Sequence, residues 1–156
     1  MKKHNRLSKK EALLRLMKLC SHSEKSAFEI EKKLNAWGLQ KEAQEIIDQL
    51  RKENFLSDTR YVKAFIHDKI FLNKWGRLKV KYLLLKNGIS SGIIENELNS
   101  LDMESYQNMI YDELNKKRAT LKKYSFQTLK TRLYAFGNQR GYETNFIRIF
   151  IEKSDT

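Results

Sequence analysis

Basic residues without acidic neighbours are concentrated in two windows of the sequence. The window 69–90 contains six Lys or Arg and the window 115–142 contains eight, with no Asp or Glu in either. Ammonium and guanidinium groups donate hydrogen bonds to phosphate oxygens. In a chain with 19 acidic residues, these windows favour a surface for a polyanion over an ordinary solvated helix face. The candidate binding residues are Lys74, Arg77, Lys79, Lys81, Lys86, Lys116, Lys117, Arg118, Lys122, Lys123, Arg132 and Arg140.

Two tyrosines lie among these charges. Tyr82 points away from the apolar side of its helix on a helical wheel, and Tyr124 falls in an expected turn between two basic clusters. Stacking on nucleobases is one interpretation, and packing at the edge of the core is the other. No helix carries Asn, Gln and Arg together on one exposed face, as a DNA-recognition helix would. We therefore expect contacts to phosphates rather than to bases.

The sequence has no motif with the geometry of an active site. His4, His22 and His67 are far apart and lack the spacing of metal ligands. His67 and Asp68 are adjacent, so on a helix they would project about 100° apart, which is poor geometry for a catalytic pair. No phosphate-binding glycine loop is present. We expect no enzyme activity, no metal and no cofactor, and an enzyme with an unrecognised site is the alternative.

The composition is typical of one helical domain. The 156 residues carry a formal net charge of +12 and include no proline and only six glycines. Basic residues are in excess in every third of the chain, which indicates a polyanionic partner, with solubility alone as the alternative. The single Cys20 has the spacing of a core residue and cannot form an internal disulfide. No apolar run is long enough for a membrane span, and residues 1–13 lack the apolar core of a signal peptide, so we expect a cytoplasmic protein.

Apolar residues recur at spacings of three and four throughout, which predicts helices. In the basic window 69–90, Val80, Leu83 and Leu84 share one narrow sector of a helical wheel, whereas Leu85 points elsewhere. Asn87-Gly88 predicts the end of that helix. Capping boxes are predicted for Ser8 with Glu11 and Ser21 with Glu24, and Asp58 is placed to cap a further helix.

Three segments share a larger plan of helix, glycine, apolar residue and helix. Gly38, Gly88 and Gly141 align at intervals of 50 and 53 residues. This period indicates a tandem helical repeat. An alternative register through Gly137 spoils the helix that follows. The predicted fold is all-α without a sheet: an elongated, curved array of three three-helix repeats, about 8–56, 57–101 and 102–153, within a single domain 1–156.

Three stretches resemble the repeated signature of the bacterial RecX family. "FLSDTRYVKAFIHDK" has a Leu-x-Asp before an Arg-aromatic pair, "WGRLKVKYLLLKNGIS" has a glycine ahead of a Leu and a Gly-Ile, and "RGYETNFI" begins with Arg-Gly-aromatic. The resemblance covers about residues 20–151. The residues that carry it are Leu56, Asp58, Arg60, Tyr61, Gly76, Val80, Leu84, Gly88, Ile89, Arg140, Gly141 and Tyr142.

This resemblance implies a non-enzymatic regulator whose partner is the RecA recombinase filament on single-stranded DNA. It implies that the protein lodges in the filament groove and inhibits ATP hydrolysis, strand exchange and filament growth. A general nucleic-acid-binding helical repeat, which contacts phosphates without a dedicated protein partner, is the alternative. We expect a monomer, no membrane association, and direct contact with DNA through phosphates.

Three residues of the resemblance also have structural interpretations. For Asp58, Gly76 and Gly88 we favour a helix cap and two helix boundaries over direct binding. An alanine at Gly76 would cost on the order of 1 kcal/mol if its φ is positive.

Overall fold

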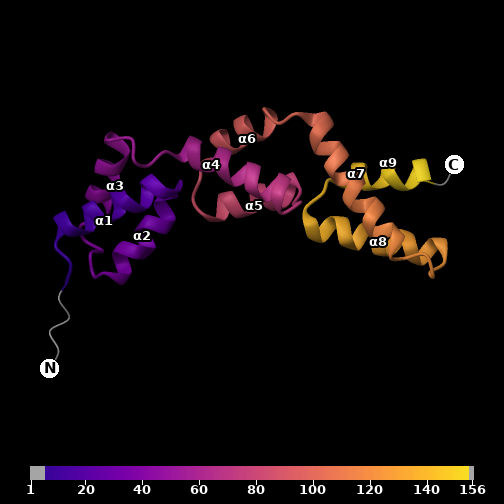
Figure 1. Ribbon diagram of the computed structural model, residues 1–156, viewed down its shortest axis with the longest axis horizontal. Coiled ribbons are helices and arrows are strands. Elements are labelled where there is room, and N and C mark those ends of the chain that lie inside the picture. The colour runs from indigo at the N-terminus through magenta and orange to yellow at the C-terminus, as the bar shows by residue number, and fades with distance from the viewer. Residues whose placement is uncertain (1–5, 155–156) are drawn as a thin grey trace, which may run out of the picture. The chain divides into compact units, whose positions relative to one another are not determined.

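Helices are the only regular secondary structure among the described residues. The computed structural model describes residues 6–154 (Figure 1), which contain α-helices and one π-helix but no strand. The predicted all-α fold is confirmed, whereas His4 lies outside the described residues. Each of these helices is too short or too polar to cross a bilayer. The elements are α1 (Lys9–His22), α2 (Ala27–Ala36), α3 (Ala43–Lys52), α4 (Asp58–Ile66), the π-helix η1 (His67–Leu72), α5 (Arg77–Lys86), α6 (Ser91–Asn99), α7 (Met103–Ala119), α8 (Phe126–Arg140) and α9 (Thr144–Ser154).

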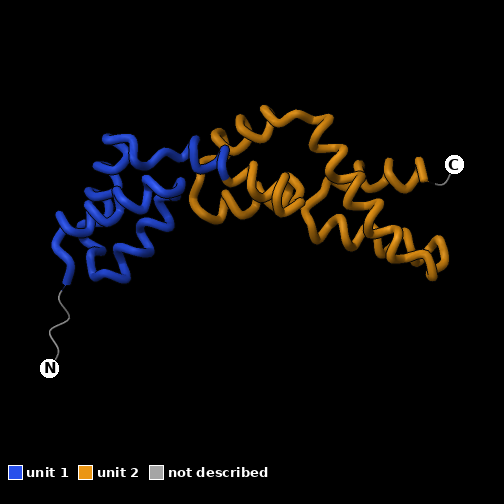
Figure 2. Tube along the Cα trace, in the orientation of Figure 1, with its two compact units in different colours: residues 1–64 blue, residues 65–156 orange. Residues whose placement is uncertain are grey.

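The chain divides into two compact units (Figure 2). Unit 1 comprises residues 1–64 and unit 2 comprises residues 65–156, so the boundary falls inside α4. Within unit 2, α7, α8 and α9 pack against one another, and η1 contacts both α5 and α7. The repeat boundaries predicted near residues 56 and 101 fall in the connections before α4 and α7, and they stay a prediction.

The three aligned glycines end their helices in the same way. Gly38, Gly88 and Gly141 have φ values of +76°, +78° and +86°, in the left-handed region that glycine adopts most readily. In each case the N–H of the next residue donates to the carbonyl five residues before it, at 2.8, 3.1 and 2.9 Å, which closes the last helical turn. This shared geometry supports the register through Gly141. Gly137 lies inside α8, where an added Cβ would be 2.4 Å from Cδ1 of Ile147.

Serine side chains start the first two helices. The capping box predicted at Ser8 is confirmed, with both reciprocal hydrogen bonds present. The box predicted at Ser21 is wrong, because α1 continues to His22. Helix α2 begins with a box formed by Ser26 and Glu29. The same pair of residue types therefore forms the capping box five positions later than predicted.

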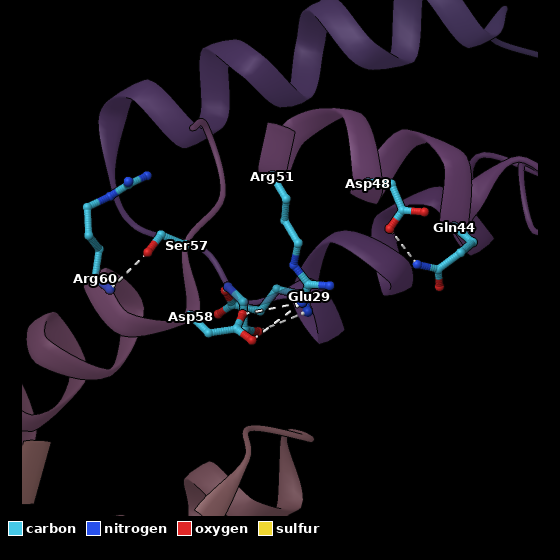
Figure 3. Close-up of polar contacts among 8 residues, drawn as sticks. Glu29, Gln44, Asp48, Arg51, Ser57, Asp58 and Arg60 are labelled. Carbon is cyan, nitrogen blue, oxygen red and sulfur yellow. Dashed lines mark hydrogen bonds and ion pairs between the residues drawn. The ribbon is translucent and has the colours of Figure 1, made fainter. Parts of the chain in front are cut away.

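The start of α4 differs from its prediction. The backbone N–H of Arg60 donates to Oγ of Ser57 at 3.3 Å (Figure 3), so Ser57 caps the helix and Asp58 is its first residue. The carboxylate of Asp58 lies 3.4 Å from the guanidinium of Arg51 in α3. As a negative charge in the first turn, Asp58 still stabilises the helix through the positive end of the helix dipole.

Most positions with core spacing are buried in both units, but Leu83 is half-buried and Phe126, the first residue of α8, is 48% exposed. In unit 1, Ile30 and Leu34 of α2 are fully buried. Cys20 is buried beside them, as predicted, and burial together with the charge of Glu24 raises the pKa of its thiol. In unit 2, Tyr106 and Tyr142 are the largest fully buried side chains.

Candidate nucleic-acid interface

The first basic window meets the turn between α8 and α9 at the start of α5. The first N–H groups of a helix have no partner inside it, and α5 has no side-chain cap. Instead, the N–H of Gly76 donates to the carbonyl of Arg140 at 2.7 Å, and the N–H of Leu78 donates to that of Gly141 at 3.1 Å. The end of α8 therefore caps the start of α5. We call residues 74–78, Tyr106 and residues 140–143 the junction.

Two glycines make this close approach possible. A Cβ on Gly76 would lie 2.1 Å from the carbonyl oxygen of Gly141, and a Cβ on Gly141 would lie 2.4 Å from the Cβ of Lys79. The helix boundaries predicted at Gly76 and Gly88 are confirmed. However, Gly76 has φ −89°, so its requirement for glycine is steric and not torsional.

Arg77 is partnered inside the junction. Its Nε donates to Oε1 of Glu143 at 2.6 Å, and its guanidinium lies 5.1 Å from the ring centroid of Tyr106. The Tyr106 hydroxyl accepts the backbone N–H of Arg77 at 2.9 Å and donates to Oε2 of Glu143 at 2.8 Å. Because one carboxylate serves both side chains, the three groups form a closed network.

Burial shifts the pKa values of the two partners of Glu143 in opposite directions: it lowers that of Arg77 and raises that of Tyr106. Burial disfavours the charge of Arg77, but the hydrogen bond and charge of Glu143 outweigh it and raise the pKa of the guanidinium. Burial raises the pKa of Tyr106, and the negative charge of Glu143 raises it further. The network therefore holds a cation, an anion and a neutral phenol.

Two more candidates of the basic windows have carboxylate partners. Lys81 pairs with Glu95 of α6, and Nη1 of Arg140 lies 3.7 Å from Oε2 of Glu113 in α7. The Glu113 side chain is only 13% exposed. As with Arg77, these charges are neutralised within the chain, and a binding role for them stays a prediction.

The remaining lysines of the first window have other surroundings. The carbonyl of Lys74 accepts the hydroxyl of Tyr142 at 2.7 Å, and burial raises the pKa of that phenol to about 12. Nζ of Lys79 lies 4.0 Å from the ring centroid of Trp75. Lys86 is exposed, and in the described part of the chain no carboxylate lies within 4.0 Å of it.

Seven of the eight basic residues of the second window, all except Arg140, surround the turn from α7 to α8, which lies at the other end of α8 from the junction (Figure 1). The helical rise places the two ends of this helix about 22 Å apart. Between residues 6 and 154, the only member of this group within 4.0 Å of a carboxylate is Lys116, which lies 3.2 Å from Glu113. We call the following residues the tip cluster: Lys116, Lys117, Arg118, Lys122, Lys123, Lys130 and Arg132.

Aromatic rings orient several of these cations without neutralising them. Tyr124 lies in the turn, as predicted, and is half-buried. The guanidinium of Arg132 lies 4.2 Å from its ring centroid and Nζ of Lys123 lies 5.2 Å from it. Cation–π contacts of this kind leave hydrogen-bond donors available for an anion. Lys117 and Arg118 make similar contacts with Phe136 and Phe150.

Sequence reasoning missed the acidic residues that neutralise the junction. Glu143 directly follows the acid-free window 115–142, and Glu113 precedes it by two residues. Their position at the window edges was the available signal, because a turn brings such residues near the basic residues of another helix. Tyr106 has helical spacing from Ile110, which indicates a core residue and gives no sign of its polar partners.

Three motif residues lie at the connection between α3 and α4 in unit 1. Nε of Arg60 donates to Glu24 at 3.0 Å, and its Nη2 donates to the carbonyl of Asn54 at 2.6 Å. Tyr61 is buried at 7% exposure. With the Asp58 to Arg51 pair, these contacts fix the chain between two helices.

The adjacent His67 and Asp68 form a surface pair. Nδ1 of His67 lies 3.4 Å from Oδ1 of Asp68, and both side chains are more than half exposed. Among residues 6–154, no three His, Cys, Asp or Glu side chains are placed to hold a metal ion.

These observations define an all-helical tandem protein in which six cations without a carboxylate within 4.0 Å, among the described residues, surround one hairpin turn. A family model described as "RecX, second three-helix domain" matches residues 57–98. A curated "Regulatory protein RecX" from Clostridium botulinum (strain Eklund 17B / Type B) is 30% identical over 155 residues, which cover 95% of this chain and 72% of the relative. Another, from Clostridium beijerinckii, is 38% identical over 109 residues, which cover 69% of this chain and 50% of the relative. The chain belongs to the RecX family.

Solved structures support the fold. The crystal structure of RecX from Lactobacillus salivarius matches with a TM-score of 0.81 at 18% identity, covering 94% of this chain and 96% of that one. A second crystal structure, of a regulatory protein RecX, matches with a TM-score of 0.82 at 16% identity, covering 92% and 71%. The resemblance found in the three sequence stretches is thus confirmed, and the names of the relatives support a regulatory role.

Proposed function

We propose that this chain is a non-catalytic regulator that binds the RecA recombinase filament on single-stranded DNA, with the tip cluster against the phosphates. It acts without a cofactor and inhibits ATP hydrolysis, strand exchange and filament growth. The observation that carries the proposal is the tip cluster itself: seven cations around one turn, of which only Lys116 has a carboxylate within 4.0 Å in the described structure. The other six cations have no carboxylate to displace before they bind, so each can interact directly with a phosphate of the partner.

The tip cluster suits the backbone of a nucleic acid better than its bases. Arg132 is held over the ring of Tyr124, so its planar guanidinium is oriented before binding and loses less freedom when it meets a phosphate. The same contact covers one face of Tyr124, which leaves that face unavailable for a base. Lys122 and Lys123 are exposed in the turn. Their side chains can adjust to the phosphates of a curved single-stranded DNA whatever its base sequence.

A charge-reversal variant tests this assignment. Changing four lysines of the tip cluster to glutamate replaces four attractive contacts by repulsive ones. We expect affinity for a labelled oligo(dT) strand to fall at least tenfold, and the slope of log affinity against log salt to decrease by about 3. Inhibition of ATP hydrolysis by RecA on single-stranded DNA should fall with it, while helical circular dichroism is retained. The variant is K116E/K117E/K122E/K123E.

A matched control changes the same net charge elsewhere. Four exposed lysines of unit 1 serve this purpose, since none has a carboxylate within 4.0 Å in the described structure. The control should keep most of the DNA affinity and the inhibition. Equal losses in both variants would mean that overall charge, not the tip cluster, governs binding. The control is K10E/K32E/K41E/K52E.

The general nucleic-acid-binding repeat is the second candidate function, because phosphate contacts at the tip cluster would serve any single strand. The two functions differ in stoichiometry. Inhibition of RecA at amounts well below one molecule per RecA protomer supports action on the filament. Inhibition only at amounts that sequester the free DNA supports the second function.

A further inference from the structure

Helix α5 presents apolar side chains on its outer side as well as to the core. Leu78, Tyr82 and Leu85 are 53%, 64% and 43% exposed, and their spacing of four and three residues places them on one face of the helix. The core side is formed by Val80 and Leu84, which are fully buried. We call Leu78, Tyr82 and Leu85 the outer stripe; it includes the leucine that lay outside the predicted core sector.

The other repeats provide an internal comparison for this stripe. Aligned on the glycines that end α2, α5 and α8, the same positions are exposed in all three helices. Isolated exposed apolar residues are common, but a stripe of three is not expected from solubility or from helix formation. Only α5 has large apolar side chains at all three positions: α2 has Phe28, Lys32 and Asn35, and α8 has Thr131, Ala135 and Asn138.

Free cations border the outer stripe on one edge. Lys79 and Lys86 project there on a helical wheel and have no carboxylate within 4.0 Å in the described structure, whereas Lys81 on the other edge is paired with Glu95. Beyond that other edge is a hollow of about 290 Å³, lined by Leu78 and Leu98 and by the polar residues Arg77, Lys81, Glu95, Asn99 and Glu143. The edge formed by Lys79 and Lys86 makes the stripe complementary to apolar anchors that have a carboxylate beside them.

We infer that the outer stripe of α5 docks a protein partner that presents apolar side chains bordered by Asp or Glu. The two leucines of the stripe have no donors for phosphate and no planar face for a base, so Tyr82 is the one side chain of the three that a nucleic acid could use. The inference rests on the proposed function: the tip cluster binds the DNA strand, and the outer stripe binds a RecA protomer of the same filament. The two surfaces therefore make separable contributions.

The test compares a stripe variant with a control that removes exposed leucines elsewhere. The stripe variant is L78S/Y82S/L85S, and the control is L14S/L72S, since Leu14 and Leu72 are 58% and 66% exposed outside the stripe. We measure the concentration that half-inhibits ATP hydrolysis by RecA on single-stranded DNA, and separately the affinity for labelled oligo(dT). The stripe variant should need at least tenfold more protein for inhibition, with DNA affinity within twofold of the parent. The control should match the parent in both assays.

Each other outcome identifies what has failed. If the parent inhibits and the stripe variant inhibits equally well, the docking surface is refuted while the proposed function stands. If the parent does not act on the filament at all, the proposed function fails and the docking surface with it. If the parent sediments as a dimer and the stripe variant as a monomer, the stripe is a contact between copies of this chain. The single variant L85S, which changes one exposed side chain, should show a smaller loss and guards against misfolding of the triple variant.

Discussion

At the junction, Arg77 and Arg140 face Glu143 and Glu113, whereas at the tip cluster the cations other than Lys116 face no carboxylate in the described structure. Both regions come from sequence windows that contain no acid. The difference arises because the acids at the junction come from another helix or from beyond the window edge. A local count of charge therefore identifies basic stretches, but only the fold decides which of them remain available to a partner.

The largest expected effect is a loss of stability on substitution of Gly76 by alanine. Its new Cβ would lie 2.1 Å from the Gly141 carbonyl, so α5 must separate from the end of α8. We expect the free energy of unfolding of unit 2 to fall by about 3 kcal/mol, measured by urea denaturation. The control is Gly92→Ala, where nothing lies within 4 Å of the added Cβ and a gain of about 0.5 kcal/mol is expected. Equal stability of the two variants would contradict the close approach at the junction.

A smaller loss is expected when the junction carboxylate is neutralised. Glu143→Gln leaves Arg77 partly buried without a counter-charge; the two side chains are 17% and 26% exposed. We expect a cost of about 2 kcal/mol, less than for a fully buried pair because water reaches both groups. The more exposed pair is the control: Glu95→Gln next to Lys81 should cost about 0.5 kcal/mol or less. If the order were reversed, the junction would not be the neutralised region of the chain.

A smaller effect than these is expected from alkaline pH, which should lower the free energy of unfolding through Tyr142 at the junction. Burial raises the pKa of Tyr142 to about 12, compared with about 10 for a free phenol. The folded state therefore holds this proton more tightly, so its contribution to stability is present below about pH 10 and is lost as pH rises toward 12. In Tyr142→Phe, the fall of unfolding free energy between pH 10 and 12 should be shallower by up to about 1.4 kcal/mol per pH unit. Denaturation curves across that range, with an unchanged slope in the variant, would argue against this protonation coupling.

The smallest effect concerns stability at the tip cluster. Lys122 and Lys123 are exposed and have no carboxylate partner in the described structure, so replacing both by alanine should change the unfolding free energy by no more than about 0.5 kcal/mol. The same double variant should weaken oligo(dT) binding. A stability loss above about 1 kcal/mol would show that the tip cluster, like the junction, holds the fold.

Much of the fold could be predicted from local residue patterns. The three glycines with positive φ follow from their spacing and from the apolar residue after each of them. Helix ends at Asn87-Gly88 and at Ser8 follow from short-range hydrogen bonding, which a sequence encodes within four residues. The capping serine was misplaced at Ser21 because Ser26 has the same pattern nearby, and packing selects between them.

The candidate site was less predictable because its partners are distant in the sequence. Arg77 and Glu143 are 66 residues apart, and no periodicity links them. The steric requirement at Gly76 depends on the carbonyl of Gly141, so a torsional explanation was the only one available from local sequence. Leu85 was recognised as an outlier of the core pattern, but its membership in a stripe became visible only from exposed areas.

The capping of α5 by the end of α8 also affects how unit 2 opens. The amide protons of Gly76 and Leu78 are hydrogen-bonded to carbonyls of residues 140 and 141, so they exchange with solvent only when the two helices part. The second and third repeats should consequently melt as one cooperative block. A protease cut between α7 and α8 would allow α8 to separate from α5. Helix α5 would then lose the carbonyl acceptors of residues 140 and 141 at its start, so the same cut should destabilise the second repeat as well as the third.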